Sequence, residues 1–264
     1  MIGRIFAIAL NTFREAIRQR VLYGILAVVV ALNVFGVVIG EMSLHQEARV
    51  ARDIGLAGIS LFGSITAIVL GVSLLYTEIQ RRTIHTLVSK PLSRWEFVLG
   101  KYFGMAATLT LLVFAFALAM LAVLEIQEVD YTNALYKAVF LSYIEVLTVA
   151  GIAIFFSSFS SPYLSGIFTF GLFFLGRATM EMRAAIEQAD NPVIVGVCKA
   201  ALFIVPNLSL YSVSGAEVGG KHVSVHGDNF VDFSYMLTAA GHGLLYTSAL
   251  LILAVVIFSR RQFV

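Results

Sequence analysis

One acidic residue lies in the middle of an apolar run that is long enough to cross a membrane. Glu145 falls within 135–156, among apolar turns and close to Ser142, Tyr143 and Thr148. A carboxylate at that depth is costly and usually marks a functional position. It could line a pathway, take up a proton, or bind a cationic group. The alternative is a protonated or hydrogen-bonded contact between helices.

A second feature is the charged, amphipathic segment 77–101, which reads TEIQRRTIHTLVSKPLSRWEFVLGK. It is much longer than a simple link between two helices needs to be. Lys90 and Pro91 end a first short helix, because a residue before proline avoids the α region. Ser93 and Glu96 have the spacing of a capping box that begins a second short helix. The pattern predicts a surface on which a partner docks; the alternative is a solvated basic turn that only fixes orientation.

Other motifs indicate little chemistry within the chain itself. His222 and His226 are four residues apart in a strand-like pattern, which separates them too widely to clamp an ion, and we expect no metal site. No phosphate-binding loop of the Gly-x4-Gly-Lys-Ser/Thr type is present, and Gly100-Lys101 is followed by Tyr102. Because there is also no hydrolase triad and no pair of catalytic carboxylates, we expect that the chain is not an enzyme.

The composition places these residues in a multi-pass membrane protein. Of the 264 residues, 59% are hydrophobic and only 13% are charged, and the mean hydropathy is +0.90. Soluble proteins carry about 25% charged residues, so this composition excludes a soluble enzyme, a nucleic-acid binder and a disordered chain. The single cysteine, Cys198, excludes a disulfide framework.

The predicted fold class is an all-α membrane protein with six transmembrane helices. Runs of about 20 apolar residues become helices in a bilayer, because no water is present to satisfy their backbone groups. The predicted spans are 21–39, 55–76, 102–124, 135–156, 162–176 and 235–258. The fifth is cut short by Arg177, and it could extend through Met180 with Arg177 snorkelling to the interface. Polar residues expected to join helices are Asn33, Ser60, Ser64, Thr66 and Ser73.

The basic residues predict which side of the membrane each loop faces. With six spans and a cytoplasmic N-terminus, the inner segments hold 11 of the 18 Lys and Arg residues and only three acidic residues. This excess follows the positive-inside rule, so we expect both termini in the cytoplasm. The segment 177–234 then lies outside. Within it, 193–206 is expected to be re-entrant or interfacial; as a seventh span, it would move Arg260 and Arg261 to the outside.

The first twenty residues are predicted to form an amphipathic helix in the inner interface. Apolar residues, Phe13 among them, recur at helical spacing, whereas Arg14 and Arg18 fall on the opposite face. Anchoring to anionic lipid follows from this pattern, and a docking role for the helix is a further possibility.

The run EIQRRTIHTLVSKPLSRWEFVLGKY resembles the inner loop of permease subunits of type-2 ATP-binding-cassette (ABC-2) transporters. The residues that match that pattern are Glu78, Thr83, Leu87, Pro91, Ser93, Arg94, Phe97, Gly100 and Lys101. Arg82 stands where the family often has glycine, so the local turn is expected to differ. The amphipathic start, the six spans and the long segment before the last span are also similar to the family. Within the family, the chain is most similar to the branch for maturation of multicopper enzymes, including nitrous oxide reductase.

The resemblance implies a division of labour between subunits. A separate ATPase dimer, which binds ATP and magnesium, would grip the loop 77–101 as a coupling helix. The residues expected to dock it are Glu78, Arg81, Arg82, Thr83, Leu87, Lys90, Pro91, Ser93, Arg94, Phe97, Gly100 and Lys101. This chain would hold no cofactor of its own.

The resemblance also implies location and partners. The chain would be half of an exporter in a bacterial cytoplasmic (inner) membrane, paired with a second copy or a paralogue, with no nucleic acid involved. A partner outside the membrane could meet 177–234. Two other functions remain open: a secondary transporter driven by protons through Glu145, and a membrane assembly factor that transports nothing.

Overall fold

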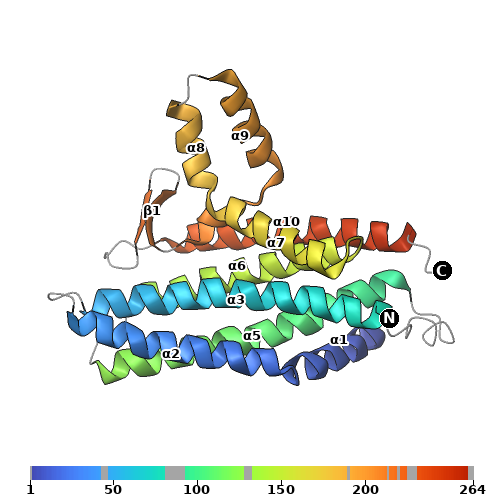
Figure 1. The fold of residues 1–264 in the computed structure, drawn as a ribbon, viewed down its shortest axis with the longest axis horizontal. Helices are drawn as coiled ribbons and strands as arrows, with labels where there is room; N and C mark the ends of the chain where they lie inside the picture. Colours follow the sequence, from blue (N-terminus) through green and yellow to red (C-terminus); the bar gives the residue numbers. More distant parts are fainter. Residues whose placement is uncertain are drawn as a thin grey trace.

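The computed structural model describes residues 2–42, 47–80, 93–127, 133–188, 191–212, 214–218, 221–224 and 231–260. Long helices lie side by side in a bundle, and a helical hairpin projects from its flank (Figure 1). The start of the chain and the end of the last helix lie at the same end of the bundle, here called the α1 end. Residues 81–92, the middle of the predicted coupling loop, lie outside the described residues.

The described helices follow the predicted order. They are α1 (Ile2–Ile17), α2 (Arg20–Met42), α3 (Glu47–Gln80), α5 (Arg94–Ile126), α6 (Asn133–Ser157), α7 (Pro162–Arg177), α8 (Thr179–Gln188), α9 (Pro192–Ile204), the 3-10 helix η1 (Leu208–Tyr211) and α10 (Phe233–Arg260). The all-α membrane architecture predicted from composition is therefore confirmed for the bundle.

Five of these helices, α2, α3, α5, α6 and α10, are long and apolar enough to cross a membrane. A sixth crossing exists only if α7 and α8 count as one span, and these two helices meet at a bend of 56°. The sixteen residues of α7 extend about 24 Å at 1.5 Å per residue, which falls short of a hydrocarbon core of about 30 Å. The predicted fifth span at 162–176 therefore crosses only part of the bundle as a straight helix.

Two helices begin before the spans predicted on them. Helix α3 begins at Glu47, ahead of the predicted span 55–76, and α5 begins at Arg94, ahead of the predicted span 102–124. The short helix predicted to start after Ser93 is consequently the first turn of α5 and not a separate element. Nothing between Arg94 and Ile126 interrupts the hydrogen bonding of the helix, since this stretch contains no proline.

Helices α8 and α9 form an arm that leaves the bundle and returns to it. Figure 1 shows the pair projecting away from the other helices. The base of the arm is closed by polar contacts, because the Thr179 hydroxyl lies 2.8 Å from Oδ1 of Asn207 and 3.0 Å from Oγ of Ser209. None of the thirteen residues of α9 is buried. At about 20 Å in length, α9 is too short to be the alternative seventh span.

After the arm, η1 returns the chain to the bundle and a short hairpin leads to α10. The Tyr211 hydroxyl of η1 donates to the Ala239 carbonyl of α10 at 3.2 Å. Strands β1 (Ser214–Val218) and β2 (Lys221–Ser224) pair antiparallel, and they are the only strands in the described part of the chain. The strand-like alternation around His222 is thus confirmed.

Close contacts between small residues hold the central helices together. A Cβ atom added at Gly63 would lie 2.7 Å from Val146, and one added at Gly71 would clash with the Cβ of Ala153, so α3 and α6 approach at these glycines. Small residues allow such approach in membranes, where dispersion replaces the hydrophobic effect between helices. The polar contacts predicted between helices are only partly present: Ser60 bonds to another helix, whereas Asn33 and Thr66 bond to carbonyls of their own helices.

A pair of glycine substitutions tests this packing. Gly71→Ala is expected to destabilise the protein, because the Cβ of Ala153 cannot rotate out of the way and α3 must shift. Gly171→Ala, on exposed α7 with nothing within 4 Å of the added atom, is expected to be neutral or to stabilise by up to about 1 kcal/mol through helix propensity. Thermal unfolding in detergent measures both, and equal midpoints would contradict the packing argument.

Candidate functional site

Three side chains from three helices meet inside the bundle at the end of α7. The Arg177 guanidinium donates to Oε1 of Glu145 at 3.0 Å and, through the same Nη1 atom, to Oγ of Ser60 at 2.6 Å. The Ser60 hydroxyl in turn donates to Oε2 of Glu145 at 2.5 Å. We call these residues the α3–α6–α7 triad. Its geometry ties α3, α6 and α7 together at a single point.

The direction of the hydrogen bonds defines the charge state that suits the triad. Both carboxylate oxygens of Glu145 accept hydrogen bonds. Arg177 donates directly to Oε1, and it also donates to Ser60, whose hydroxyl donates to Oε2. An ionised carboxylate fits this arrangement because it has acceptors only. The Glu145 side chain is 1% exposed, whereas that of Arg177 is 35% exposed. The triad is therefore a neutral ion pair whose cationic partner reaches the surface of the bundle.

The position of Arg177 bears on one possibility left open by the sequence. If the fifth span extended through Met180, snorkelling would take the charge of Arg177 to the interface. In the structure it instead turns to Glu145, and the helix breaks immediately afterwards at Ala178, whose amide still bonds to Phe174. An opposite charge nearby satisfies the guanidinium inside the bundle, so no extension of α7 through Met180 is needed to carry it outward.

The signal that could have revealed this pair was present in the sequence. Glu145 and Arg177 are opposite charges that each interrupt or end a long apolar stretch, and charges in that setting usually pair with one another. Ser60 gave no comparable signal, because serines are frequent in membrane helices.

The predicted docking residues that the structure describes gather at the α1 end, around the first turns of α5. The Ser93 amide donates to a carboxylate oxygen of Glu96 at 3.1 Å, so the predicted capping box is present. Arg94 is exposed, and its Nη1 donates at 2.9 Å to the carbonyls of Phe258 and Ser259 at the end of α10. Arg94 thus caps the last carbonyls of α10 with a cation, which also suits the helix dipole.

Phe97 extends the same junction between α5 and α10. Its ring stacks on Phe258 with centroids 5.8 Å apart and an interplanar angle of 13°. Glu78 lies in the last turn of α3, but the remaining predicted docking residues, Arg81, Arg82, Thr83, Leu87, Lys90 and Pro91, lie outside the described residues.

Gly100 and Lys101 face α1 and do not lie at the surface. A Cβ atom at Gly100 would lie 2.7 Å from Ile8, and one at Gly104 would lie 2.5 Å from the Ala9 carbonyl oxygen. Lys101 is 1% exposed and forms an ion pair with Glu15 at 3.7 Å. These residues bind α5 to α1, so in this structure a partner subunit cannot reach them directly.

Helix α1 is consequently held by protein as well as by its apolar stripe. Thr12 and Ala16 are fully buried, whereas Phe6 is 67% exposed on the side left for lipid. Phe13 is half-buried, and Arg14 and Arg18 are exposed as the amphipathic pattern predicts. The position of α1 against α5 could not be predicted from the stripe alone.

The two groups of predicted residues lie apart. The triad joins α3, α6 and α7, whereas the docking residues Arg94, Phe97 and Lys101 join α5 to α10 and α1. His222 lies in β2 and His226 lies outside the described residues. Within the described ranges, no three His, Cys, Asp or Glu side chains gather as metal ligands would.

Comparison with known families identifies this architecture. The profile described as ABC-2 family transporter protein matches residues 6–263, nearly the whole chain. The chain belongs to the ABC-2 transporter family. No protein of curated function matches it significantly. The family assignment makes the chain the membrane domain, or permease subunit, of an ABC transporter, and implies partnership with an ABC ATPase subunit.

The ion pair of this ABC-2 permease can be tested by a double-mutant cycle. Glu145→Gln or Arg177→Gln alone is expected to destabilise the permease by up to about 3–5 kcal/mol, because each leaves one charge unpaired inside the bundle. Because the Arg177 side chain is partly exposed to solvent, the loss of stability is expected to fall below the upper end of this range. The double variant is expected to lose less than the sum of the two. Thermal unfolding in detergent measures the cycle, and strictly additive losses would contradict the pairing.

A second prediction isolates the serine of the triad. Ser60→Ala is expected to destabilise the permease by about 1.5–3 kcal/mol, the usual contribution of a hydrogen bond to a charged group. Ser64→Ala is the matched control one turn away, since its buried hydroxyl has no hydrogen-bond partner among the described residues. The same unfolding assay applies, and equal effects of the two variants would argue against a bridging role for Ser60.

Proposed function

We propose that this permease couples ATP hydrolysis by a separate ATPase dimer to movement of a substrate across a bacterial cytoplasmic membrane, in the direction of export. Both termini lie in the cytoplasm in this proposal, which places the α1 end there. ATP and magnesium are bound by the ATPase subunits. A second permease copy or a paralogue completes the transporter, and a further partner can meet 177–234 on the outer side.

The observation that carries this proposal is the junction at the start of α5. The loop 77–101 leads directly into a turn that is bonded to α10 through Arg94 and packed on α1 through Gly100 and Gly104. A displacement of the loop is therefore transmitted to three helices at once. A loop that only linked two spans would not require such connections.

Burial divides the docking residues that the structure describes into two roles in this mechanism. Arg94, which is exposed, makes contact with the ATPase, and the sequence adds the basic loop residues Arg81 and Arg82 to that contact. Gly100 and Lys101 transmit the resulting movement to α1, because they are covered by that helix.

The triad supplies a fixed point deeper in the bundle. Ser60, Glu145 and Arg177 join α3, α6 and α7 where α7 bends into the arm. We propose that Arg177, which is partly exposed, lines the pathway while Glu145 holds it in place. Both oxygens of Glu145 accept hydrogen bonds, from Ser60 and Arg177, and this arrangement fits a positioning role for an ionised carboxylate better than a proton carrier.

Isolation of the intact transporter tests the proposal. A tagged wild-type chain, purified from its native membrane in mild detergent, is expected to bring down an ABC ATPase. Arg81→Glu combined with Arg82→Glu is expected to release it by reversing the charge of the docking surface. Arg183→Glu, on the exposed surface of the arm, is the control and should retain the ATPase.

The outcomes separate two failures. An ATPase that stays bound to the double loop variant would overturn the docking assignment alone. A wild-type chain that carries no ATPase, and transports in vesicles without one, would overturn the proposed function.

A further inference from the structure

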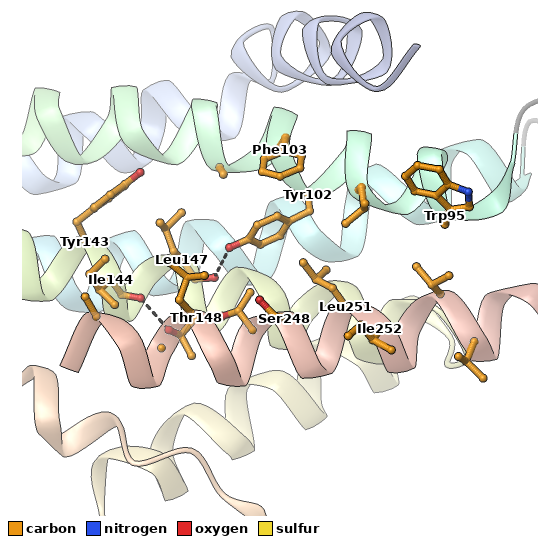
Figure 2. A pocket seen from close by; sticks show the side chains of 18 residues that line it. Trp95, Tyr102, Phe103, Tyr143, Ile144, Leu147, Thr148, Ser248, Leu251 and Ile252 are labelled. Atoms are coloured by element: carbon orange, nitrogen blue, oxygen red, sulfur yellow. Dashed lines mark hydrogen bonds between the residues drawn. The ribbon is translucent and has the colours of Figure 1, made fainter. Parts of the chain in front are cut away.

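An apolar groove opens on the side of the bundle between α5 and α10, with α6 as its floor. It has a volume of about 650 Å³ and contains no residue of α3 or α7, so it is separate from the triad. Figure 2 shows side chains of α5, α6 and α10 around it, with Trp95 toward one end and Tyr143 toward the other. We call it the α5–α10 groove.

We infer that the α5–α10 groove binds one acyl chain of an anionic glycerophospholipid from the surrounding bilayer, with the headgroup at the α1 end. The inference goes beyond the proposed transport function and does not depend on it.

The chemistry of the walls selects a hydrocarbon chain. The hydroxyls in the groove are largely satisfied within the protein: Tyr102 donates to the Leu147 carbonyl at 3.4 Å, and Thr148 donates to that of Ile144 at 2.9 Å. Tyr143 shares a hydrogen bond of 2.8 Å with Thr110. A ligand in the groove therefore meets mainly carbon, and a polar substrate would lose its hydration without compensation.

The dimensions of the groove also suit an acyl chain. Its lining on α10 runs from Ala240 to Val256, which corresponds to about 24 Å of helix. One leaflet of a bilayer contributes about 15 Å of hydrocarbon, so an extended chain can follow the groove from the interface inward.

Charge at the α1 end selects the headgroup. Arg260 at the end of α10 is exposed, and Arg94 at the start of α5 donates to the Ser259 carbonyl just before it. Among the described acidic residues near this end, Glu15 pairs with Lys101, and Glu96 is buried with its carboxylate bonded to the Ser93 amide. Trp95, a residue type typical of membrane interfaces, lies beside these cations at the mouth of the groove. A headgroup with net negative charge fits this end better than a zwitterionic one.

Trp95 makes the inference directly measurable, because it is the only tryptophan in the chain. The protein is reconstituted into phosphatidylcholine vesicles in two titrations. One adds increasing fractions of phosphatidylglycerol with brominated acyl chains, and the other adds phosphatidylcholine with brominated acyl chains. Bromine quenches tryptophan fluorescence on contact. Half-maximal quenching is expected at a mole fraction of brominated phosphatidylglycerol about fivefold lower than that of brominated phosphatidylcholine.

Two variants and a control distinguish the groove from ordinary surrounding lipid. Ser248→Phe fills the groove and is expected to remove most of the selective quenching, whereas Ala249→Phe, exposed on the same helix but not part of the groove lining, should not. Arg260→Gln leaves the groove open and is expected to reduce the headgroup preference by more than half. Equal quenching by the two lipids, or equal effects of the two phenylalanine variants, would overturn the inference.

Discussion

The structure depends on one constraint: within a bilayer, a charge must find its partner inside the protein. Glu145 meets this constraint through Arg177 and Ser60, and the bonds come from three helices that are far apart in the sequence. Their meeting point coincides with the end of α7, so the break in that helix and the buried ion pair form one feature. The cost of an unpaired carboxylate gives this point a fixed geometry.

Around that point, close contacts at glycines add to the packing of large apolar side chains in the core. The glycines of α3 bring α6 near enough for direct contact, and Gly100 and Gly104 do the same for α1 against α5. Since lipid offers no hydrophobic drive for helices to associate, fit at short range decides which helices become neighbours. The same fit makes the α1 end a connected unit, to which Arg94 adds the end of α10.

The outward faces of the bundle serve different purposes from the inner ones. Hydrogen bonds of Thr179 close the base of the arm formed by α8 and α9. Helix α9 is apolar and has no buried residue, so lipid or another protein chain must cover it. The α5–α10 groove is lined by residues of α5, α6 and α10, and the exposed Arg260 lies at the end of α10.

The sequence by itself determined the membrane class, the order and approximate length of the helices, the capping box at Ser93, and the presence of a carboxylate, Glu145, within an apolar helix. These features follow from composition, periodicity and the cost of a buried charge, all of which act locally along the chain. Only the tertiary structure decided that Arg177 pairs with Glu145 and that Gly100 and Lys101 lie beneath α1. Hydropathy records how strongly a segment prefers lipid. Which helices become neighbours depends instead on side-chain shape and on whether charges from distant segments meet at the same depth. Neither property produces a periodic pattern in the sequence.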